Sequence, residues 1–245
     1  MPRFFVEREN VDLAGGRVII TADARHISRS LRMAVGDTVT VCDGSSTEYV
    51  CALTRIRDDE CECKILSSAS GGGESPLSIT LCMAYPKGDK LETVIQKSVE
   101  LGASRIVPFE SSRCIKRPKA EKLDRVTERL QRIAEEAAKQ CGRSRIPEVS
   151  APVCYREMLE IAGSADLALF CYEGEEDNSL SRVLSEKRDV KSVSVIVGSE
   201  GGFSKDEAEA AVAAGCVSVS LGKRILRCET APSYVLSVLS YVYES

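Results

Sequence analysis

The segment SVSVIVGSEGGFS, residues 192–204, runs from a mostly apolar strand into a loop with three glycines. Such a strand is typical of a parallel sheet that helices cover on both faces. Ligands of open α/β sheets bind beyond the carboxyl ends of strands, and glycines there let the backbone approach a ligand closely. The alternative is a simple helix start, since Ser204 and Glu207 have the spacing of a capping box. That box leaves the glycines unexplained, and the loop matches neither G-x-G-x-x-G nor a P-loop.

A second strand, residues 217–221, leads into GKRILRCET, residues 222–230. Ile225 and Leu226 are apolar and lie beside Arg227, so this loop could wall a pocket for a flat, mostly apolar ring with a polar edge. The alternative is a surface loop with solvated charges. The two loops together favour a ligand site at one edge of a sheet.

Strands and helices alternate through the longer, second part of the chain. We expect strands at residues 79–84, 105–109, 166–172, 192–198 and 217–221, and helices at residues 89–101, 121–141, 180–186, 205–214 and 231–243. This alternation predicts an α/β fold with a mainly parallel sheet covered on both faces.

A glycine-rich stretch, SSASGGGESP at residues 67–76, separates this part from the first. Three glycines flanked by serine and closed by proline resist both helix and strand. Before it, short strands are expected at residues 3–6, 17–20, 38–42, 49–56 and 60–66, with a helix at 22–33. Many short strands in a small unit predict a compact β-barrel. We therefore expect a barrel domain at 1–70, a linker at 71–76 and an α/β domain at 77–245.

Composition narrows the function classes. The net charge is −4, so a nucleic-acid surface must be a local patch, and the absence of Trp argues against a broad stacking platform. The chain has eleven Cys but no C-x-x-C, and His26 is its only His. It therefore lacks the usual ligand pattern of a zinc site, and no metal is expected. No apolar run approaches the length of a membrane span. These features predict a reduced, cytoplasmic protein without a membrane segment.

A local basic patch lies at residues 113–145, where eleven Lys or Arg face five Asp or Glu. The ordinary explanation is a solvated helix face with paired charges. However, one apolar stripe runs along this helix and leaves several basic residues on other faces: Arg125, Arg129, Arg132 and Lys139. The pattern favours contacts with RNA phosphates, which Arg29 and Arg32 of the first part could extend.

These motifs resemble a known family. The segments GSEGGFSKDE (198–207) and LGKRILRCETAP (221–232) are similar to the closing motifs of SPOUT methyltransferases, and among them to the 16S ribosomal RNA uracil-N3 methyltransferases. Further ordered matches span nearly the whole chain: His26-x-x-x-x-Leu31-Arg32, Gly36-Asp37, Lys87-Gly88-Asp89-Lys90, Lys97-x-x-Glu100-Leu101-Gly102 and Glu136-Ala137-Ala138-x-Gln140-x-x-Arg143. Ser199 and Cys228 depart from the family pattern, which usually has Pro and Thr there.

The resemblance implies a small PUA-like barrel before a SPOUT domain whose C-terminal segment forms a trefoil knot. It also implies a homodimer that binds S-adenosylmethionine and methylates N3 of one uridine, position 1498, of 16S rRNA in the small ribosomal subunit. The residues expected at the cofactor are Leu169, Phe170, Gly198, Ser199, Glu200, Gly201, Gly202, Leu221, Gly222, Ile225, Leu226, Arg227 and Thr230. Those expected at the RNA are Arg29, Arg32, Lys87, Arg113, Gln140, Arg143 and Arg145.

The expected chemistry needs no metal, because the sulfonium of the cofactor already activates its methyl group. The uracil N3 becomes a good nucleophile only when its proton leaves, so a proton acceptor or a cation that stabilises the anion is needed. Arg227 could stabilise the anion, and Glu200 or Glu229 could accept the proton. The ordinary alternatives are a solvated Arg227 and a Glu229 that stabilises a helix N-terminus.

Two other functions fit the same residues. One is a non-catalytic RNA-binding or ribosome assembly factor that has kept the fold, and the other is a SPOUT enzyme that methylates a different RNA position. We also expect that valine at Gly201 blocks cofactor binding by placing Cβ in ligand space, and that alanine at Arg143 weakens RNA binding.

Overall fold

The computed structural model describes residues 1–115 and 120–244. The chain divides into two compact units. The first unit contains Met1–Glu74 and Ala138–Ile146, and the second contains Ser75–Ala137 and Pro147–Ser245. The first unit thus combines the N-terminal part of the chain with a segment from its middle, whereas the sequence predicts domains at 1–70 and 77–245 with a linker at 71–76.

The first unit is built on a six-stranded, mostly antiparallel sheet in the order β1-β4-β5-β6-β3-β2, in which only β1 and β4 pair in parallel. Its strands are β1 (Arg3–Phe5), β2 (Val11–Asp12), β3 (Arg17–Ile20), β4 (Thr38–Cys42), β5 (Thr47–Ile56) and β6 (Cys61–Ser70). Alternate residues of these strands are buried in one apolar core, which includes Phe4, Ile20, Val39 and Leu53.

The helix expected at residues 22–33 is much shorter than the sequence suggested. Only a π-helical turn, His26–Ser30, forms there. Arg32 has φ 51°, in the left-handed region that ends a helix, and the side chains of Ser28 and Arg29 bind Asp58. Local side-chain hydrogen bonds and one left-handed residue thus replace the long helix.

The glycine segment, residues 71–74, was expected to be part of a flexible linker but packs closely within the first unit. A Cβ on Gly73 would lie 2.7 Å from the carbonyl oxygen of Gly142. That distance is shorter than Cβ atoms tolerate, so glycine is needed because two backbones meet. Glycine here serves close packing, and not only freedom of the chain.

The carboxylate of Glu74 closes this contact. It accepts hydrogen bonds from the backbone N–H groups of Ser144 and Arg145, both at 2.9 Å, and from Nη2 of Arg143 at 2.6 Å. Arg3 Nη1 donates to the carbonyl oxygen of Arg143 at 3.2 Å. A segment 70 residues later in the sequence is thereby fixed to the end of the glycine segment.

The second unit contains a seven-stranded sheet in which every pairing is parallel. The order is β10-β8-β7-β12-β11-β13, with β9 beside β8. The strands are β7 (Ser78–Ala84), β8 (Arg105–Glu110), β9 (Glu148–Val149), β10 (Val153–Cys154), β11 (Leu167–Cys171), β12 (Ser192–Val197) and β13 (Val217–Val219). This confirms the expected parallel α/β sheet; the trefoil knot stays a prediction, because strand order does not describe threading.

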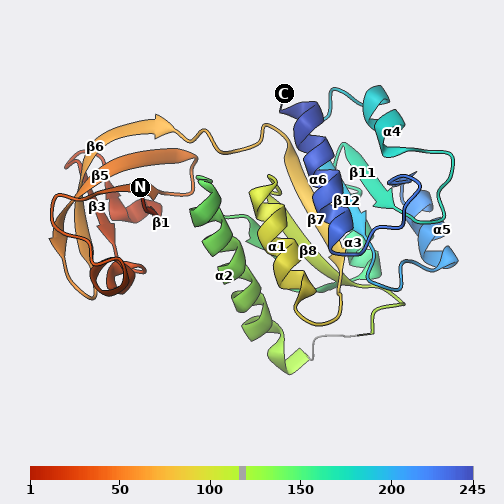
Figure 1. The fold of residues 1–245 in the computed structure, drawn as a ribbon, viewed down its shortest axis with the longest axis horizontal. Coiled ribbons are helices and arrows are strands. Elements are labelled where there is room, and N and C mark those ends of the chain that lie inside the picture. The colour runs from red at the N-terminus through yellow and green to blue at the C-terminus, as the bar shows by residue number, and fades with distance from the viewer. Residues whose placement is uncertain (116–119, 245) are drawn as a thin grey trace. The chain divides into compact units, whose positions relative to one another are not determined.

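Helices cover both faces of this sheet (Figure 1). They are α1 (Lys90–Glu100), α2 (Leu123–Cys141), α3 (Tyr155–Ala162), α4 (Leu180–Glu186), α5 (Lys205–Ala213) and α6 (Thr230–Tyr243). In Figure 1, α1 and α6 lie side by side in front of the strands, and α3 lies behind them. Helices on both faces explain why β11 is buried at every residue and β12 at nearly every one.

Helix α3 was not expected from the sequence. Its start is stabilised by Glu157, whose carboxylate accepts a hydrogen bond from the backbone N–H of Cys154 at 3.0 Å. Cys154 occupies the position where Ser, Thr, Asp or Asn usually signals a helix start, so the usual signal is missing. The capping box at α5 is confirmed, since Ser204 Oγ accepts from Glu207 N at 3.2 Å and Glu207 Oε2 accepts from Ser204 N at 2.9 Å.

Candidate active site

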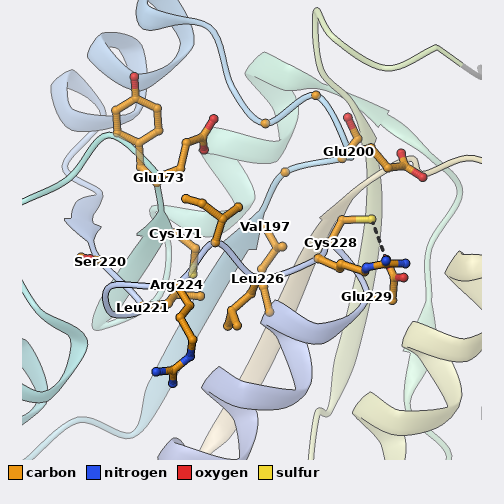
Figure 2. Close-up of a pocket in the computed structure, with 18 of the residues that line it drawn as sticks. Cys171, Glu173, Val197, Glu200, Ser220, Leu221, Arg224, Leu226, Cys228 and Glu229 are labelled. Atoms are coloured by element: carbon orange, nitrogen blue, oxygen red, sulfur yellow. Dashed lines mark hydrogen bonds between the residues drawn. The ribbon is translucent and has the colours of Figure 1, made fainter.

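A cavity of about 500 Å³ opens in the second unit at the carboxyl ends of β11, β12 and β13. Its walls are residues 171–173, 197–202, 220–222 and 224–229, together with Lys90 and Ala231. Cavities of roughly 300–1,000 Å³ are typical of small-molecule and cofactor sites. In Figure 2, Glu200, Cys228 and Glu229 lie on one side of the cavity, and Glu173, Leu221 and Arg224 on the other.

The cavity contains both loops that the sequence singled out. Of the residues expected at the cofactor, ten line it: Gly198, Ser199, Glu200, Gly201, Gly202, Leu221, Gly222, Ile225, Leu226 and Arg227. Leu169 and Phe170 do not, because they lie inside β11 and are fully buried in the core. Thr230 does not line it either, although its neighbours on both sides do.

The lining instead includes residues that the sequence analysis did not select. Cys171, Tyr172 and Glu173 replace Leu169 and Phe170, because the strand end reaches the cavity one residue later than expected. A register argument could have found them, since Cys171 pairs with Val197 and Val219, the last residues of β12 and β13. Lys90 reaches the cavity from the start of α1, and although it belongs to the motif Lys87-Gly88-Asp89-Lys90, it is not among the residues expected at the cofactor.

Tight backbone packing shapes the glycine loop, residues 198–202. A Cβ on Gly198 would lie 3.1 Å from the Phe203 ring and 3.2 Å from the Cα of Gly202. Phe203 is buried and its ring centroid lies 4.4 Å from that of Phe170, so this ring cannot move aside easily. Gly198 therefore lets the loop turn tightly over an aromatic core.

Gly201 has a different neighbour from the one expected. A Cβ on Gly201 would lie 3.0 Å from Cβ and 3.3 Å from the carbonyl oxygen of Arg113. Arg113 Nη1 also donates a 2.9 Å hydrogen bond to the Gly201 carbonyl. The loop after β8 thus holds the glycine loop, and valine at Gly201 would press on Arg113; its effect on cofactor binding stays a prediction.

Three charged side chains meet at one wall of the cavity. Lys90 Nζ lies 3.0 Å from Glu200 Oε1 and 3.3 Å from Glu229 Oε2. Burial alone would raise the pKa of Glu200, but hydrogen bonds from Lys90 and from the backbone N–H groups of Glu200 and Lys87 hold it below its usual range. Both carboxylates are therefore ionised at neutral pH and can accept protons or bind a cation.

Cys228 and Ser199, the two departures from the family pattern, are both buried at this site. The Cys228 thiol donates to Glu229 Oε2 at 3.2 Å. Burial and this hydrogen bond raise the pKa of Cys228 to about 12, so it is a thiol and not a reactive thiolate. A threonine hydroxyl could donate in the same way. The Ser199 carbonyl accepts from Gly202 N at 3.0 Å, which closes the turn of the glycine loop without proline.

Ile225 and Arg227 project from the second loop. Ile225 is 81% exposed, and Arg227 is also exposed while lining the cavity. An exposed isoleucine at the mouth of a cavity can cover an apolar ring, and a guanidinium there can stabilise an anion.

The residues expected at RNA are placed unequally. Arg32, Lys87, Gln140 and Arg145 are exposed. Arg29 is exposed but paired with Asp58, and Arg113 donates to Gly201 as described above. Arg143 is only 5% exposed and forms an ion pair with Glu74, so its guanidinium holds the first unit together and is not presented to a phosphate. This corrects the expectation for Arg143.

Two features are absent from the described part of the chain, residues 1–115 and 120–244. No group of three or more His, Cys, Asp or Glu side chains there is arranged to hold a metal ion. No helix within those same ranges is long and apolar enough to cross a membrane.

Comparison with known proteins identifies the family. An RNA methyltransferase domain model matches residues 73–240, and an RNA methyltransferase PUA domain model matches residues 19–66. Ribosomal RNA small subunit methyltransferase E of Bacillus subtilis is 32% identical over 250 residues, covering 100% of this chain and 98% of that protein. The Synechocystis protein of the same name is 35% identical over 228 residues, covering 93% of this chain and 73% of that protein.

A solved structure agrees with the sequence comparison. The crystal structure of ribosomal RNA small subunit methyltransferase E from Neisseria gonorrhoeae, bound to S-adenosyl methionine, matches with a TM-score of 0.89 and 32% identity, over 99% of this chain and 98% of that one. Both units of the fold are included in this match. The chain therefore belongs to the ribosomal RNA small subunit methyltransferase E family.

Proposed function

We propose that this protein transfers a methyl group from S-adenosylmethionine to N3 of one uridine in 16S rRNA of the small ribosomal subunit. The cavity at the ends of β11, β12 and β13 carries the proposal, because it joins the glycine loop, an apolar wall and ionised side chains in one place. Full-length relatives carry the name of small-subunit rRNA methyltransferases, and one related structure contains the cofactor.

The residues of the cavity fit this cofactor. Its volume of about 500 Å³ suits a nucleoside-sized ligand, and the tight turn at Gly198 brings backbone groups to its edge. Leu226 and Ile225 offer apolar surface for an adenine ring, while Glu173, Glu200 and Glu229 supply negative charge. When bound, S-adenosylmethionine supplies an electrophilic methyl group on a sulfonium.

The protein's own side chains then handle the proton and the charge of the uracil. Glu200 or Glu229 accepts the N3 proton, directly or through water, and the N3 electron pair becomes available for the new N–C bond. The Arg227 guanidinium stabilises the negative charge that develops on the uracil. In-line positioning of the two substrates supplies much of the remaining rate.

The test uses small ribosomal subunits from cells that lack this gene. Purified protein and labelled S-adenosylmethionine should place one methyl group on 16S rRNA, and mass mapping should assign it to uracil N3. Methylation of another base would replace the substrate assignment. Cofactor binding measured by calorimetry separates the enzyme from an RNA-binding assembly factor, because no binding at millimolar cofactor would exclude methyl transfer.

The exposed basic residues of α2 are proposed to contact rRNA phosphates. Arg125 and Arg132 are exposed on this helix. We expect Arg132→Ala to weaken binding to the small subunit about threefold to tenfold and to reduce the slope of log K against log salt by about 1. Filter binding at several salt concentrations measures both. Arg156→Ala, which changes an exposed arginine of helix α3, is the matched control, and an equal loss there would argue against a specific α2 contact.

We also propose a homodimer that works in the cytoplasm, where ribosomes are assembled. Apolar side chains are exposed in the second cavity loop and in α6. Ile225 of the loop is 81% exposed, and Tyr234 of α6 is 42% exposed. Exposed apolar surface of this kind is typical of a protein interface. Light scattering after gel filtration tests the dimer, and a mass of 26.6 kDa would contradict it.

A further inference from the structure

Among the described residues that line the cavity, Lys90 is the one basic side chain from outside the loops 198–202 and 220–229 and the end of β11. It is the first residue of α1, and its ammonium lies between two carboxylates from separate segments, Glu200 after β12 and Glu229 before α6. Its side chain is 36% exposed, so the ammonium reaches the cavity and is not enclosed in the core. Two loops far apart in the sequence thus share a single cation.

Other polar groups bind the two carboxylates that Lys90 joins. The Cys228 thiol donates a hydrogen bond to Glu229, and the backbone N–H of Lys87 donates one to Glu200. The remaining charged groups that line the cavity are Glu173, Arg224 and Arg227. Among the described side chains, Lys90 alone forms ion pairs with both Glu200 and Glu229. Without that ammonium, the negative charges of Glu200 and Glu229 would lie at one wall of the cavity without their shared positive partner.

We propose that Lys90 is a positioning residue that holds Glu200 and Glu229 together as an ionised pair, so that the uracil proton is accepted by a lysine-bridged carboxylate pair and not by Glu200 acting alone. The inference rests on the proposed methyl transfer and assigns the proton acceptor within it. The N3 proton moves to one carboxylate oxygen, the N3 electron pair forms the bond to carbon, and the carbon–sulfur bond breaks with its electrons kept by sulfur. The sulfonium becomes a neutral thioether, and the carboxylic acid then returns its proton to water.

Electrostatics supports this role. Hydrogen bonding to Glu200 raises the pKa of Lys90, which keeps the lysine charged through the neutral range. The backbone N–H of Glu229, the Cys228 thiol and Lys90 keep the pKa of Glu229 below its usual range against the opposing effect of burial. An opposite charge at this distance lowers a carboxyl pKa, and a neighbouring like charge raises one of the two. Removing the lysine charge therefore makes the pair bind a proton at higher pH.

The proposal predicts a change in the pH profile. Lys90→Met should move the acid limb of kcat/KM upward by about one pH unit, because the unbridged pair must lose a proton before it can accept one. The rate should fall about tenfold at the acid limb and recover toward the wild-type value at high pH. Lys90→Arg should restore most of the profile. Lys97→Met is the matched control, because Lys97 lies on the same helix and pairs with Glu100 away from the cavity.

A second measurement does not depend on activity. Carbon-13 titration of glutamate side chains in the cofactor-free protein, assigned with Glu200→Gln and Glu229→Gln, should show both wild-type carboxyls titrating below the usual value of about 4.3. In Lys90→Met, or in Lys90→Gln if the first variant does not fold, at least one should titrate higher. A wild-type carboxyl that titrates at or above its usual value would overturn the proposal even if neither variant folds.

The outcomes also separate this inference from the proposed function. A rate loss in Lys90→Met that is equal at every pH, or an unchanged acid limb, would show that Lys90 does not control the pair. Wild-type protein that binds cofactor but transfers no methyl group to the small subunit would overturn the proposed function instead, and the carbon-13 titration would still decide the ionisation of the pair.

Discussion

Arg143→Ala is expected to lower the free energy of unfolding of the first unit by about 3 kcal/mol, because it leaves the Glu74 carboxylate buried without its partner. Arg143 is nearly inaccessible, and Nη2 lies 2.6 Å from Glu74 Oε2. Hydrogen exchange of the full chain measures the change, with the loss of protection concentrated in Met1–Glu74.

Arg145→Ala is the matched control for this variant. Arg145 is the exposed neighbour whose backbone N–H, and not its side chain, binds Glu74, so its replacement should leave the stability almost unchanged. If Arg143→Ala instead keeps normal protection and weakens rRNA binding with a smaller salt slope, Arg143 is a phosphate contact after all.

The same ion pair predicts how stability depends on pH. Burial opposes it, but Arg143 and the backbone N–H groups of Arg145 and Ser144 hold the pKa of Glu74 below its usual range. A carboxyl with a lowered folded pKa contributes stability that is present above its unfolded pKa and is lost as pH falls through the folded value. The first unit should therefore lose protection in acid, and Arg143→Ala should reduce that dependence.

Gly198→Val is expected to weaken S-adenosylmethionine binding at least about 100-fold, equivalent to about 2.7 kcal/mol. Its side chain would meet the buried Phe203 ring and the backbone of Gly202, so the turn over the aromatic core must open. Since this turn forms one wall of the cavity, the cofactor would lose a preformed surface. Calorimetry measures the dissociation constant, and circular dichroism shows whether the fold is kept.

Gly72→Ala is the control glycine, because a Cβ there meets nothing within 4 Å and its φ is not left-handed. It should bind the cofactor normally. Normal affinity in Gly198→Val would mean that the glycine loop starts α5 and has no part in binding, which was the ordinary explanation of its sequence.

The parts of the fold that the sequence predicted are those with a strong local pattern. The apolar strand before Gly198 and the capping box at Ser204 are each predicted by a pattern of a few consecutive residues, and both are present. Helix α3 was missed because Cys154 replaces a usual capping residue, and the helix expected at residues 22–33 is shorter because Arg32 has a left-handed backbone. Sequence patterns fail where an uncommon residue caps a helix or an uncommon backbone conformation ends one.

The site was predicted where it consists of consecutive residues and was missed where distant segments meet. The glycine loop and residues 221–227 are each one run of consecutive residues, whereas Lys90, although part of a motif, joins them only because α1 begins beside β12 in space. Arg143 shows the opposite error, since a basic stretch suggested a surface charge that Glu74 in fact buries. Pairings across about 70 or 110 residues leave no periodic signal in one sequence.

The two-segment composition of the first unit affects how the protein can be made. The Glu74 carboxylate gains its hydrogen-bond donors only when Arg143, Ser144 and Arg145 have been synthesised. The first unit therefore cannot complete its packing until residue 146 has left the ribosomal exit tunnel. At about 5–20 residues per second, the delay after residue 74 is several seconds. A truncated gene that ends at the glycine segment would yield a chain in which the Glu74 carboxylate has no partner and the segment Ala138–Ile146 is missing. We expect chaperones and proteases to recognise such a chain.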